Sequence, residues 1–367
     1  MWKNSDTDNP NHSLIYSDNK GYPLLGIARN TSPNEKTASI WIGTNSEGFS
    51  IMNTLSYNLT EERDASRNGT LMRRALEVCK TVPDFQQFLD TLARPLKVEA
   101  NYGVIDAEGN AAYFETSTTG YRMLDVNDPS VAPNGYLIYT NFSYTGFYDK
   151  GEGYIRYQSA QHQVAQRLPA KDFSPQWIFN NLARCYYHSL LDIDFTSREA
   201  LDLFRSGYIP DSDLITRKST ASATVIQGVK KGENPELTTL WTALGYPSCS
   251  VAMPAWVKAG TDNPALLMRY DNKYTAKICD MALALKENLY DVKRGHGEAY
   301  LHFSKLFNQA GTGYRQQLAL IENQVFERVN LLIEKSRTNG SVSTQEIKET
   351  GNFICALVEN AWPENTK

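Results

Sequence analysis

Apolar and polar residues alternate most regularly over residues 37–58, TASIWIGTNSEGFSIMNTLSYN. Ile40–Ile42 form an apolar run, Thr44–Gly48 have the chemistry of a turn, and apolar side chains recur at every second position over Phe49–Leu55. The pattern predicts two strands joined by a turn, with Asn53 on the apolar face. A buried amide without a partner costs about 1–3 kcal/mol. Asn53 must therefore bond neighbouring backbone, as at a strand end, or face a site.

Similar patterns predict further elements along the chain. Strands are expected over residues 13–16, 22–28, 101–115 (a hairpin turning at 106–109), 135–142, 222–229 and 248–253. Helical spacing, N-caps and capping boxes predict helices over residues 71–80, 155–168, 174–190 and 196–207. A further helix is expected to begin with Pro83 in its first turn. The first sixty residues thus read as a β-meander, followed by packing helices and more hairpins.

From about residue 263 the helical pattern replaces the strand pattern. Helices are expected over residues 264–292, 299–307, 313–337 and 343–362. No internal repeat or low-complexity linker divides the chain. We therefore expect an α+β protein with a strand-rich core over residues 1–262 and a helical extension over residues 263–367 packed on that core.

Composition narrows the classes of partner. The chain has 367 residues, of which 41% are hydrophobic and 11% aromatic, enough for a large core. Lys and Arg number 37 against 41 acidic residues and form no long runs, which argues against a nucleic-acid or anionic-membrane partner. No apolar stretch approaches the roughly 20 residues needed to span a bilayer. The sequence as written reads as soluble and without a signal peptide, although an upstream signal peptide could be missing, so the compartment stays open.

Common metal and cofactor motifs are missing from the sequence. The five cysteines, Cys79, Cys185, Cys249, Cys279 and Cys355, lie far apart without a CxxC pair. The five histidines form no HExxH, and no complete Walker A, GxGxxG or GxSxG occurs. Near the start, Asp6 and Asp8 alternate as in a calcium loop but lack its glycine and distal glutamate, so a solvated terminus or Asx turn is favoured. We expect no metal and no cofactor.

Five sequence segments, taken in order, resemble one enzyme superfamily. They are WKNSDTDNPN, GTNSEGFSIMNTLSYN, NYGVIDAEGNAAYFE, YTNFS and LGYPSCSVAMP. Together they resemble the choloylglycine hydrolase and penicillin acylase superfamily of N-terminal-nucleophile (Ntn) hydrolases over most of the first 255 residues. Within it the chain looks similar to bacterial linear-amide C–N hydrolases and acyl-coenzyme A:6-aminopenicillanic acid acyltransferase-like proteins (peptidase C45-like). The resemblance implies a four-layer αββα sandwich, with the helical tail as a C-terminal extension.

The resemblance also implies a chemistry and residues to perform it. A cysteine at the mature N-terminus acts as nucleophile and uses its own α-amine as base, because such an amine titrates near 7.7–8. Asp6 takes the position of the carboxylate that holds this amine, and Lys3 that of a basic residue often found as arginine. Asn141 matches the side-chain donor to the oxyanion, and Asn53 matches a second donor, expected to act through its backbone N–H. The implied partner is a small acyl amide substrate, and a homo-oligomer is left open.

Two positions depart from the family pattern. The family's cysteine lies one strand upstream of the motif that holds Lys3 and Asp6, so none of the cysteines in this sequence fills the role. Thr224 stands where bile-salt hydrolases carry an arginine, which disfavours bile salts as substrates; Arg217 is nearby but is not a motif match. Three hypotheses remain: a linear-amide hydrolase whose start is truncated here, a catalytically silent binding protein that keeps the pocket, and an acyltransferase using the same thioester.

Overall fold

Two antiparallel sheets form the centre of the protein. The computed structural model describes residues 1–29, 34–60, 64–270, 273–296 and 298–363. The seven-stranded sheet is a meander of β2 (His12–Ser17), β3 (Leu24–Arg29), β4 (Ile42–Asn45), β5 (Ser50–Leu55), β6 (Ala100–Ile105), β7 (Ala111–Thr116) and β8 (Tyr121–Asp125). The four-stranded sheet has the order β1 (Trp2–Asp6), β12 (Thr220–Gln227), β13 (Thr239–Leu244) and β14 (Met253–Ala255).

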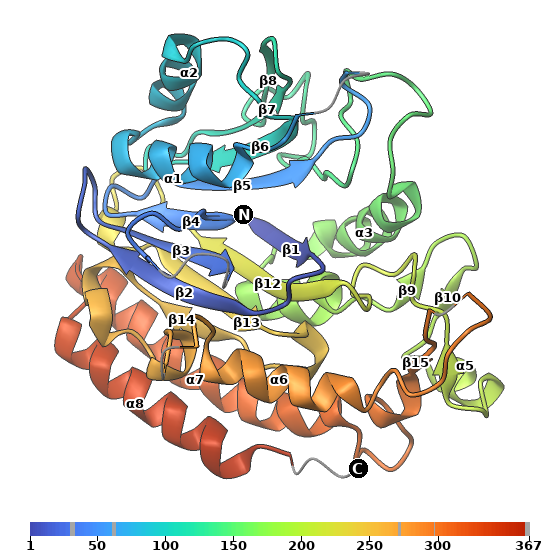
Figure 1. Cartoon of the computed structure of the whole chain (residues 1–367). Helices are drawn as coiled ribbons and strands as arrows, with labels where there is room; N and C mark the ends of the chain where they lie inside the picture. Colours follow the sequence, from blue (N-terminus) through green and yellow to red (C-terminus); the bar gives the residue numbers. More distant parts are fainter. Residues whose placement is uncertain (30–33, 61–63, 271–272, 297, 364–367) are drawn as a thin grey trace.

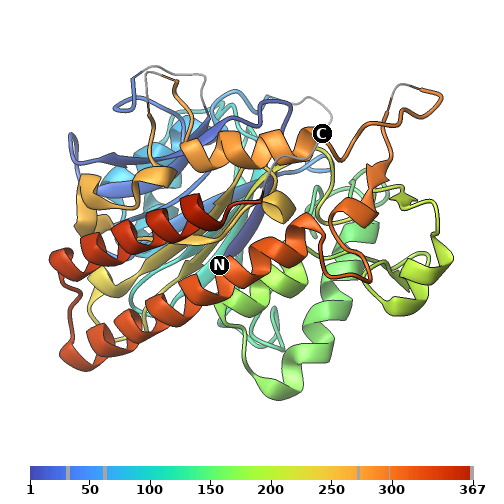
Figure 2. The same ribbon diagram turned by 90° about the horizontal axis from the view of Figure 1, so that it is seen from below.

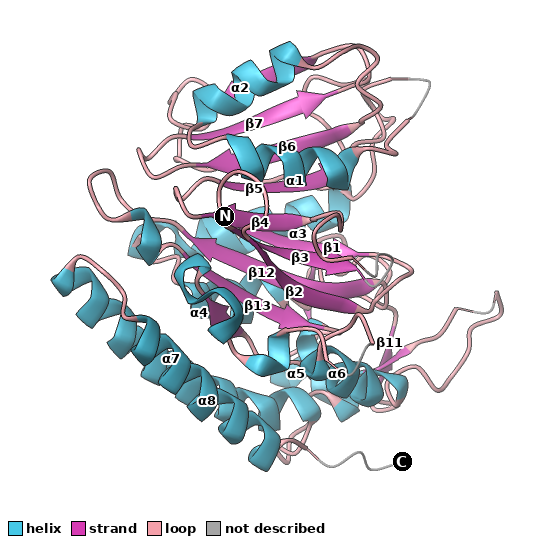
Figure 3. Ribbon diagram, turned by 60° about the vertical axis from the view of Figure 1, so that its left-hand side comes forward, coloured by secondary structure: helices cyan, strands magenta, loops and turns pink. Residues whose placement is uncertain are grey.

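Helices cover the outer face of each sheet, which makes four layers (Figure 1). Helices α1 (Asn68–Val78) and α2 (Val82–Thr91) pack on the seven-stranded sheet and share an apolar core with it. Helices α6 (Lys277–Glu287), α7 (Tyr314–Asn339) and α8 (Thr344–Ala361) lie beyond the four-stranded sheet (Figure 3). The layers run helix, sheet, sheet, helix, so the chain has the α+β architecture of a four-layer αββα sandwich.

Helices α7 and α8 form a pair that runs along one side of the four-stranded sheet (Figure 2). Gly340 ends α7 in the left-handed conformation with φ 70°, and the Ser343 hydroxyl caps α8 by accepting from the backbone N–H of Glu346. These stop and start signals were readable from the sequence, which predicted helices over 313–337 and 343–362. None of the described helices has the length and apolar character to cross a membrane.

The predicted hairpins of the meander are present. Residues 13–16 and 22–28 form β2 and β3, and residues 101–115 form β6 and β7. The turn between β4 and β5 depends on Gly48, whose φ of 78° suits glycine, and on Asn45, which accepts from the backbone N–H groups of Glu47 and Phe49. The apolar run before this turn becomes strand only from Ile42 onward.

Two strand predictions were wrong, and one strand was missed. Residues 135–142 form no ladder, and only Asn141 makes an isolated bridge, to Glu152. Instead, side chains from neighbouring strands donate hydrogen bonds to the backbone of this segment. Thr54 donates to Thr140 O, and Asn101 donates to Phe142 O. Residues 248–253 are mostly a 3-10 turn and loop before β14. Strand β13, a fully buried member of its sheet, was missed.

Several helices are shorter than predicted. Over 174–190 there is α4 (Pro175–Ile178), then a π-helical turn over Phe179–Ala183, and Arg184 leaves the helix to enter the buried cluster described below. The expected helix over 264–292 is a short 3-10 turn followed later by α6, and 299–307 holds β15 (Leu301–His302) and a 3-10 turn. Helix α3 spans Tyr154–Arg167, close to the prediction. Helix α5 spans Arg198–Leu203 and is capped by Ser197.

A buried ion cluster fastens α7 to the rest of the molecule. Glu322 on α7 accepts two hydrogen bonds from Arg184, at 2.7 and 2.8 Å, and a third contact from Arg315 at 3.4 Å. Both arginines also donate to the backbone oxygen of Ser250. Burial alone would raise the pKa of Glu322, but the two guanidinium groups hold it below its usual value. One carboxylate is thus shared by two buried guanidinium groups, and backbone oxygens accept further N–H groups of both arginines.

We expect Glu322→Gln to lower the free energy of unfolding by about 3–5 kcal/mol, because two buried guanidinium groups lose their carboxylate. Urea denaturation at neutral pH measures the change. Glu327→Gln is the matched control, since Glu327 is exposed on the same helix. A loss below about 1 kcal/mol for Glu322→Gln would show that the cluster contributes no more than a surface pair.

Candidate active site

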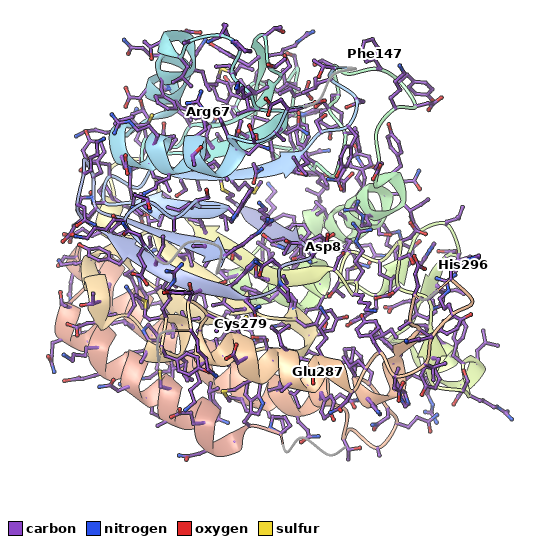
Figure 4. The ribbon with its side chains drawn as sticks, in the orientation of Figure 1. Asp8, Arg67, Phe147, Cys279, Glu287 and His296 are labelled. Atoms are coloured by element: carbon purple, nitrogen blue, oxygen red, sulfur yellow. The ribbon has the colours of Figure 1, made fainter. Side chains whose placement is uncertain are left out.

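A cavity of about 590 Å³ lies along the free edge of β1. All residues from Met1 to Asp6 line it, although successive side chains of a strand point to opposite faces. The cavity therefore borders the strand's edge, the side away from β12, where no other described strand pairs with β1. Figure 4 labels Asp8, just beyond the end of β1, and Phe147, on a loop farther out on the same side of the molecule.

Lys3 connects β1 to the opposite sheet. Its Nζ donates to the backbone oxygen of Trp41 and to Oδ1 of Asn53, both at 2.8 Å. Within the described residues no carboxylate lies at ion-pair distance from this amine. Burial and, to a smaller extent, the nearby Arg29 lower the pKa of Lys3 to about 7, while Asp6 opposes the shift. The amine can thus exchange a proton near neutral pH, which an arginine at this position could not do.

Arg29, at the end of β3, was missed by the sequence reasoning. Its guanidinium lies 4.1 Å from the centre of the Trp41 ring and lines the cavity. Its Nε is buried without a hydrogen-bond partner, and the described part of the chain gives the guanidinium no ion pair. The available signal was a charged residue that ends the apolar run Leu24–Ala28.

The two predicted asparagines both line the cavity. Asn53, on β5 and only 4% exposed, is oriented by Lys3, which bonds its Oδ1. Asn141 accepts from Nη2 of Arg156 at 2.7 Å and donates through Nδ2 to Leu55 O at 3.2 Å. An amide nitrogen carries two hydrogens, so one N–H of Asn141 remains for another acceptor. Arg156, on α3, is a further site residue that the sequence reasoning did not find.

Asp6 lies at the far end of β1 from the chain's first residue. Its carboxylate accepts from Nε of Arg217 at 2.9 Å and from the Thr220 hydroxyl at 2.7 Å. The Met1 amine instead donates to Ile226 O at 3.0 Å, and burial lowers its pKa to about 6. At about 3.3 Å per residue, the five steps from Met1 to Asp6 span roughly 16 Å. The Met1 amine therefore does not occupy the position expected next to Asp6.

Thr224 lies directly across from Lys3 in the β1–β12 ladder. Its hydroxyl is 3.0 Å from the hydroxyl of Thr242 and is buried. Thr224 stands where the family resemblance places an arginine in bile-salt hydrolases. Its side chain faces the same inter-sheet space as Lys3 but carries no charge.

One part of the cavity is polar and another is apolar. Lys3, Asn53, Asp6 and Asn141 line the polar part. The apolar part is lined by side chains from the segment before Asn141, from α3 and α4, and from the π-helical turn after α4, among them Leu137, Ile138, Val164, Ile178 and Leu182. Such a division suits a substrate that has an apolar group joined to a polar centre.

None of the chain's cysteines lines the cavity. Cys79, Cys185, Cys249 and Cys279 are buried elsewhere, and burial raises the pKa of Cys185 to about 12, which disfavours its thiolate. Within the described residues, no group of three His, Cys, Asp or Glu side chains is placed to hold a metal ion.

Comparisons with known proteins found one family model and several solved structures that are similar to the chain. A family model described as acyl-coenzyme A:6-aminopenicillanic acid acyl-transferase matches residues 1–197. The solved N-acylethanolamine-hydrolyzing acid amidase ortholog of Caenorhabditis elegans is 14% identical, with a TM-score of 0.39, covering 61% of this chain and 85% of that chain. A variant of the conjugated bile acid hydrolase of Clostridium perfringens is 14% identical, with a TM-score of 0.37, covering 66% and 84%. Penicillin V acylase of Agrobacterium tumefaciens is 12% identical, with a TM-score of 0.38, covering 70% and 82%. No curated protein matches the chain.

Lys3→Met tests the state of the buried amine. The folded pKa of Lys3, about 7, lies below its ordinary 10.5, so between these values the unfolded chain binds the proton more tightly. Stability contributed by this group therefore rises with pH across that window. We expect the wild type to gain up to a few kcal/mol over Lys3→Met as the pH rises from about 6 to 10.

Urea denaturation at about pH 6, 8 and 10 measures this gain. Lys231→Met serves as control, because the Lys231 side chain is 77% exposed. A difference between wild type and Lys3→Met that stays constant with pH would contradict a lowered pKa for Lys3.

Proposed function

The chain belongs to the acyl-coenzyme A:6-aminopenicillanic acid acyl-transferase family, and we propose on that premise that it is an Ntn-type hydrolase of linear, non-peptide amides. The observation that carries the proposal is the cavity along the free edge of β1, where Lys3, Asp6, Asn53 and Asn141 line one space. These residues come from separate parts of the chain and supply the donors and the carboxylate that such a reaction needs.

In the proposed reaction a cysteine nucleophile attacks the amide carbonyl carbon. The cysteine would begin a strand that precedes β1 and pairs with its free edge, and Asp6 would hold its α-amine. The α-amine takes the thiol proton, the thiolate forms a C–S bond, and the carbonyl oxygen becomes an oxyanion. The C–N bond then breaks, the amine leaves with the proton, and water hydrolyses the resulting thioester.

The two asparagines support the oxyanion part of this proposal. The free N–H of Asn141 is available to an oxygen in the cavity. Lys3 binds Oδ1 of Asn53 and holds this residue at the cavity, where its backbone N–H is the expected second donor. Fixed donors of this kind act without reorganising during the reaction, and each can contribute some 10²–10³-fold in rate.

Two alternatives have specific support. No cysteine of this chain lines the cavity, which favours a silent binding protein. An acyltransferase would form the same thioester and pass the acyl group to an amine, as the family description suggests. Product analysis with and without an added amine distinguishes transfer from hydrolysis.

N-terminal sequencing and intact mass of the protein purified from its host test the nucleophile. We expect a mature chain that begins with cysteine and continues into Lys3 through one further strand. Iodoacetamide should modify that cysteine and abolish release of amine from acyl amides. A mature chain that begins at Met1 or Trp2 would refute the cysteine mechanism. The silent binding protein would then be the favoured alternative.

Asn141→Ala tests the oxyanion donor. In the active protein we expect kcat to fall about 10²–10³-fold with a smaller change in KM, because the donor acts on the charge that develops at the carbonyl oxygen. Asn19→Ala is the control, since Asn19 is exposed on a turn far from the cavity lining. A variant that lost affinity but kept kcat would assign Asn141 to ground-state binding.

A further inference from the structure

We propose that Glu115, on β7, is a positioning residue whose buried carboxylate fixes the loop that carries Asn141. This inference rests on the proposed function and deepens it by adding a residue that acts on the site through Asn141. Residues 139–145, here called the Asn141 loop, join no sheet ladder, and side chains of the seven-stranded sheet hold the loop in place.

Glu115 lies on the face of β7 that is turned toward the Asn141 loop. Successive side chains of a strand point to opposite faces. Phe114 packs into the core shared with α1 and α2, so Tyr113 and Glu115 point the other way. The rings of Tyr113 and Tyr139 lie 4.0 Å apart, centre to centre. Glu115 itself is only 2% exposed.

Four donors of the Asn141 loop bind the Glu115 carboxylate. Oε1 accepts from the Tyr139 hydroxyl at 3.0 Å and from the backbone N–H of Tyr144 at 2.6 Å. Oε2 accepts from the backbone N–H of Thr145 at 3.0 Å and from the Thr145 hydroxyl. These donors precede and follow Asn141, so one carboxylate holds the loop on both sides of the proposed oxyanion donor.

This arrangement requires a carboxylate. In the part of the chain that the structure describes, no cation forms an ion pair with Glu115, so its hydrogen-bond partners there are neutral donors. A carboxylate accepts through both oxygens and carries no hydrogen, whereas the amide of a glutamine would turn an N–H₂ group toward some of these donors. Burial and the Glu115 charge raise the pKa of Tyr139, which keeps this hydroxyl protonated as a donor.

Glu115 differs in its effect from the other groups that contact this loop. Arg156 and Leu55 O orient the amide of Asn141, but they do not fix the loop backbone. Asn58 accepts from the backbone N–H of Ser143 at 2.7 Å and donates to its oxygen at 3.0 Å, which holds the loop only after Asn141. A catalytic group displaced by about 1 Å can lose some 10²-fold in rate.

Backbone hydrogen exchange of the 367-residue chain, followed by mass spectrometry, tests the anchor. In Glu115→Gln we expect the amides of Tyr144 and Thr145 to exchange at least about tenfold faster, the scale of a lost charge-assisted hydrogen bond. Glu99→Gln is the matched control, because Glu99 is also 2% exposed but accepts from Thr60. It should leave exchange in the Asn141 loop unchanged.

Thr145→Val is a second variant, for the case that Glu115→Gln does not fold. Thr145 is exposed, and the substitution removes one of the donors to Glu115 from the side of the loop. We expect it also to speed exchange of the loop amides, by less than Glu115→Gln.

The effect on the reaction is measured in the active protein. We expect Glu115→Gln to lower kcat at least about tenfold with a smaller change in KM. In the Asn141→Ala background the same substitution should lower kcat less than about threefold further, because the donor that Glu115 positions is already absent. A residue that only stabilises the fold would lower kcat by the same factor in both backgrounds.

The anchor and the reaction can fail separately. Unchanged exchange of the loop amides in Glu115→Gln and Thr145→Val overturns the proposal, as does an equal loss of kcat in both backgrounds. A chain that shows the local exchange effect but cleaves no acyl amide retains the anchor and loses the hydrolase function. A protein that cleaves acyl amides with a kcat unaffected by Glu115→Gln retains the function and loses the positioning residue.

Discussion

The hydrogen bonds of the Lys3 amine fasten the edge of one sheet to the middle of the other. Most of the space between the sheets is filled by apolar side chains such as Leu14, Ile27, Ile42 and Val225. At β1 an ammonium-bearing side chain enters that space and must find acceptors, since an unpaired buried charge is costly. Trp41 O and Asn53 Oδ1 meet this need. The orientation of Asn53 and the polar character of the cavity both depend on this contact.

The sequence predicted the parts of the fold that carry local signals. Alternation with a Gly48 turn located β4 and β5, and the Ser343 cap located α8. Strand β13 was missed because it is buried on both faces and reads as a short apolar run without alternation. The segment over 135–142 has the composition of a strand, but side chains from Thr54 and Asn101 satisfy its backbone in place of a ladder.

The candidate site was predictable in part. Family resemblance selected Lys3, Asp6, Asn53 and Asn141, and all four line one cavity. Their partners could not be read from the sequence, because the contacts join distant positions: Lys3 meets Asn53 across 50 residues and Asp6 meets Arg217 across 211. Arg29 has no motif of its own, and its place beside Trp41 at the cavity is visible only in the three-dimensional arrangement.

The ion cluster around Glu322 also sets an order in time. Arg184 is synthesised 138 residues before the carboxylate that neutralises it. At the usual elongation rate of 5–20 residues per second, the ribosome needs roughly 7–30 seconds to cover that distance. During this interval burial of the Arg184 guanidinium would carry a large penalty, so we expect Arg184 to reach its final position only after Glu322 on α7 has been synthesised.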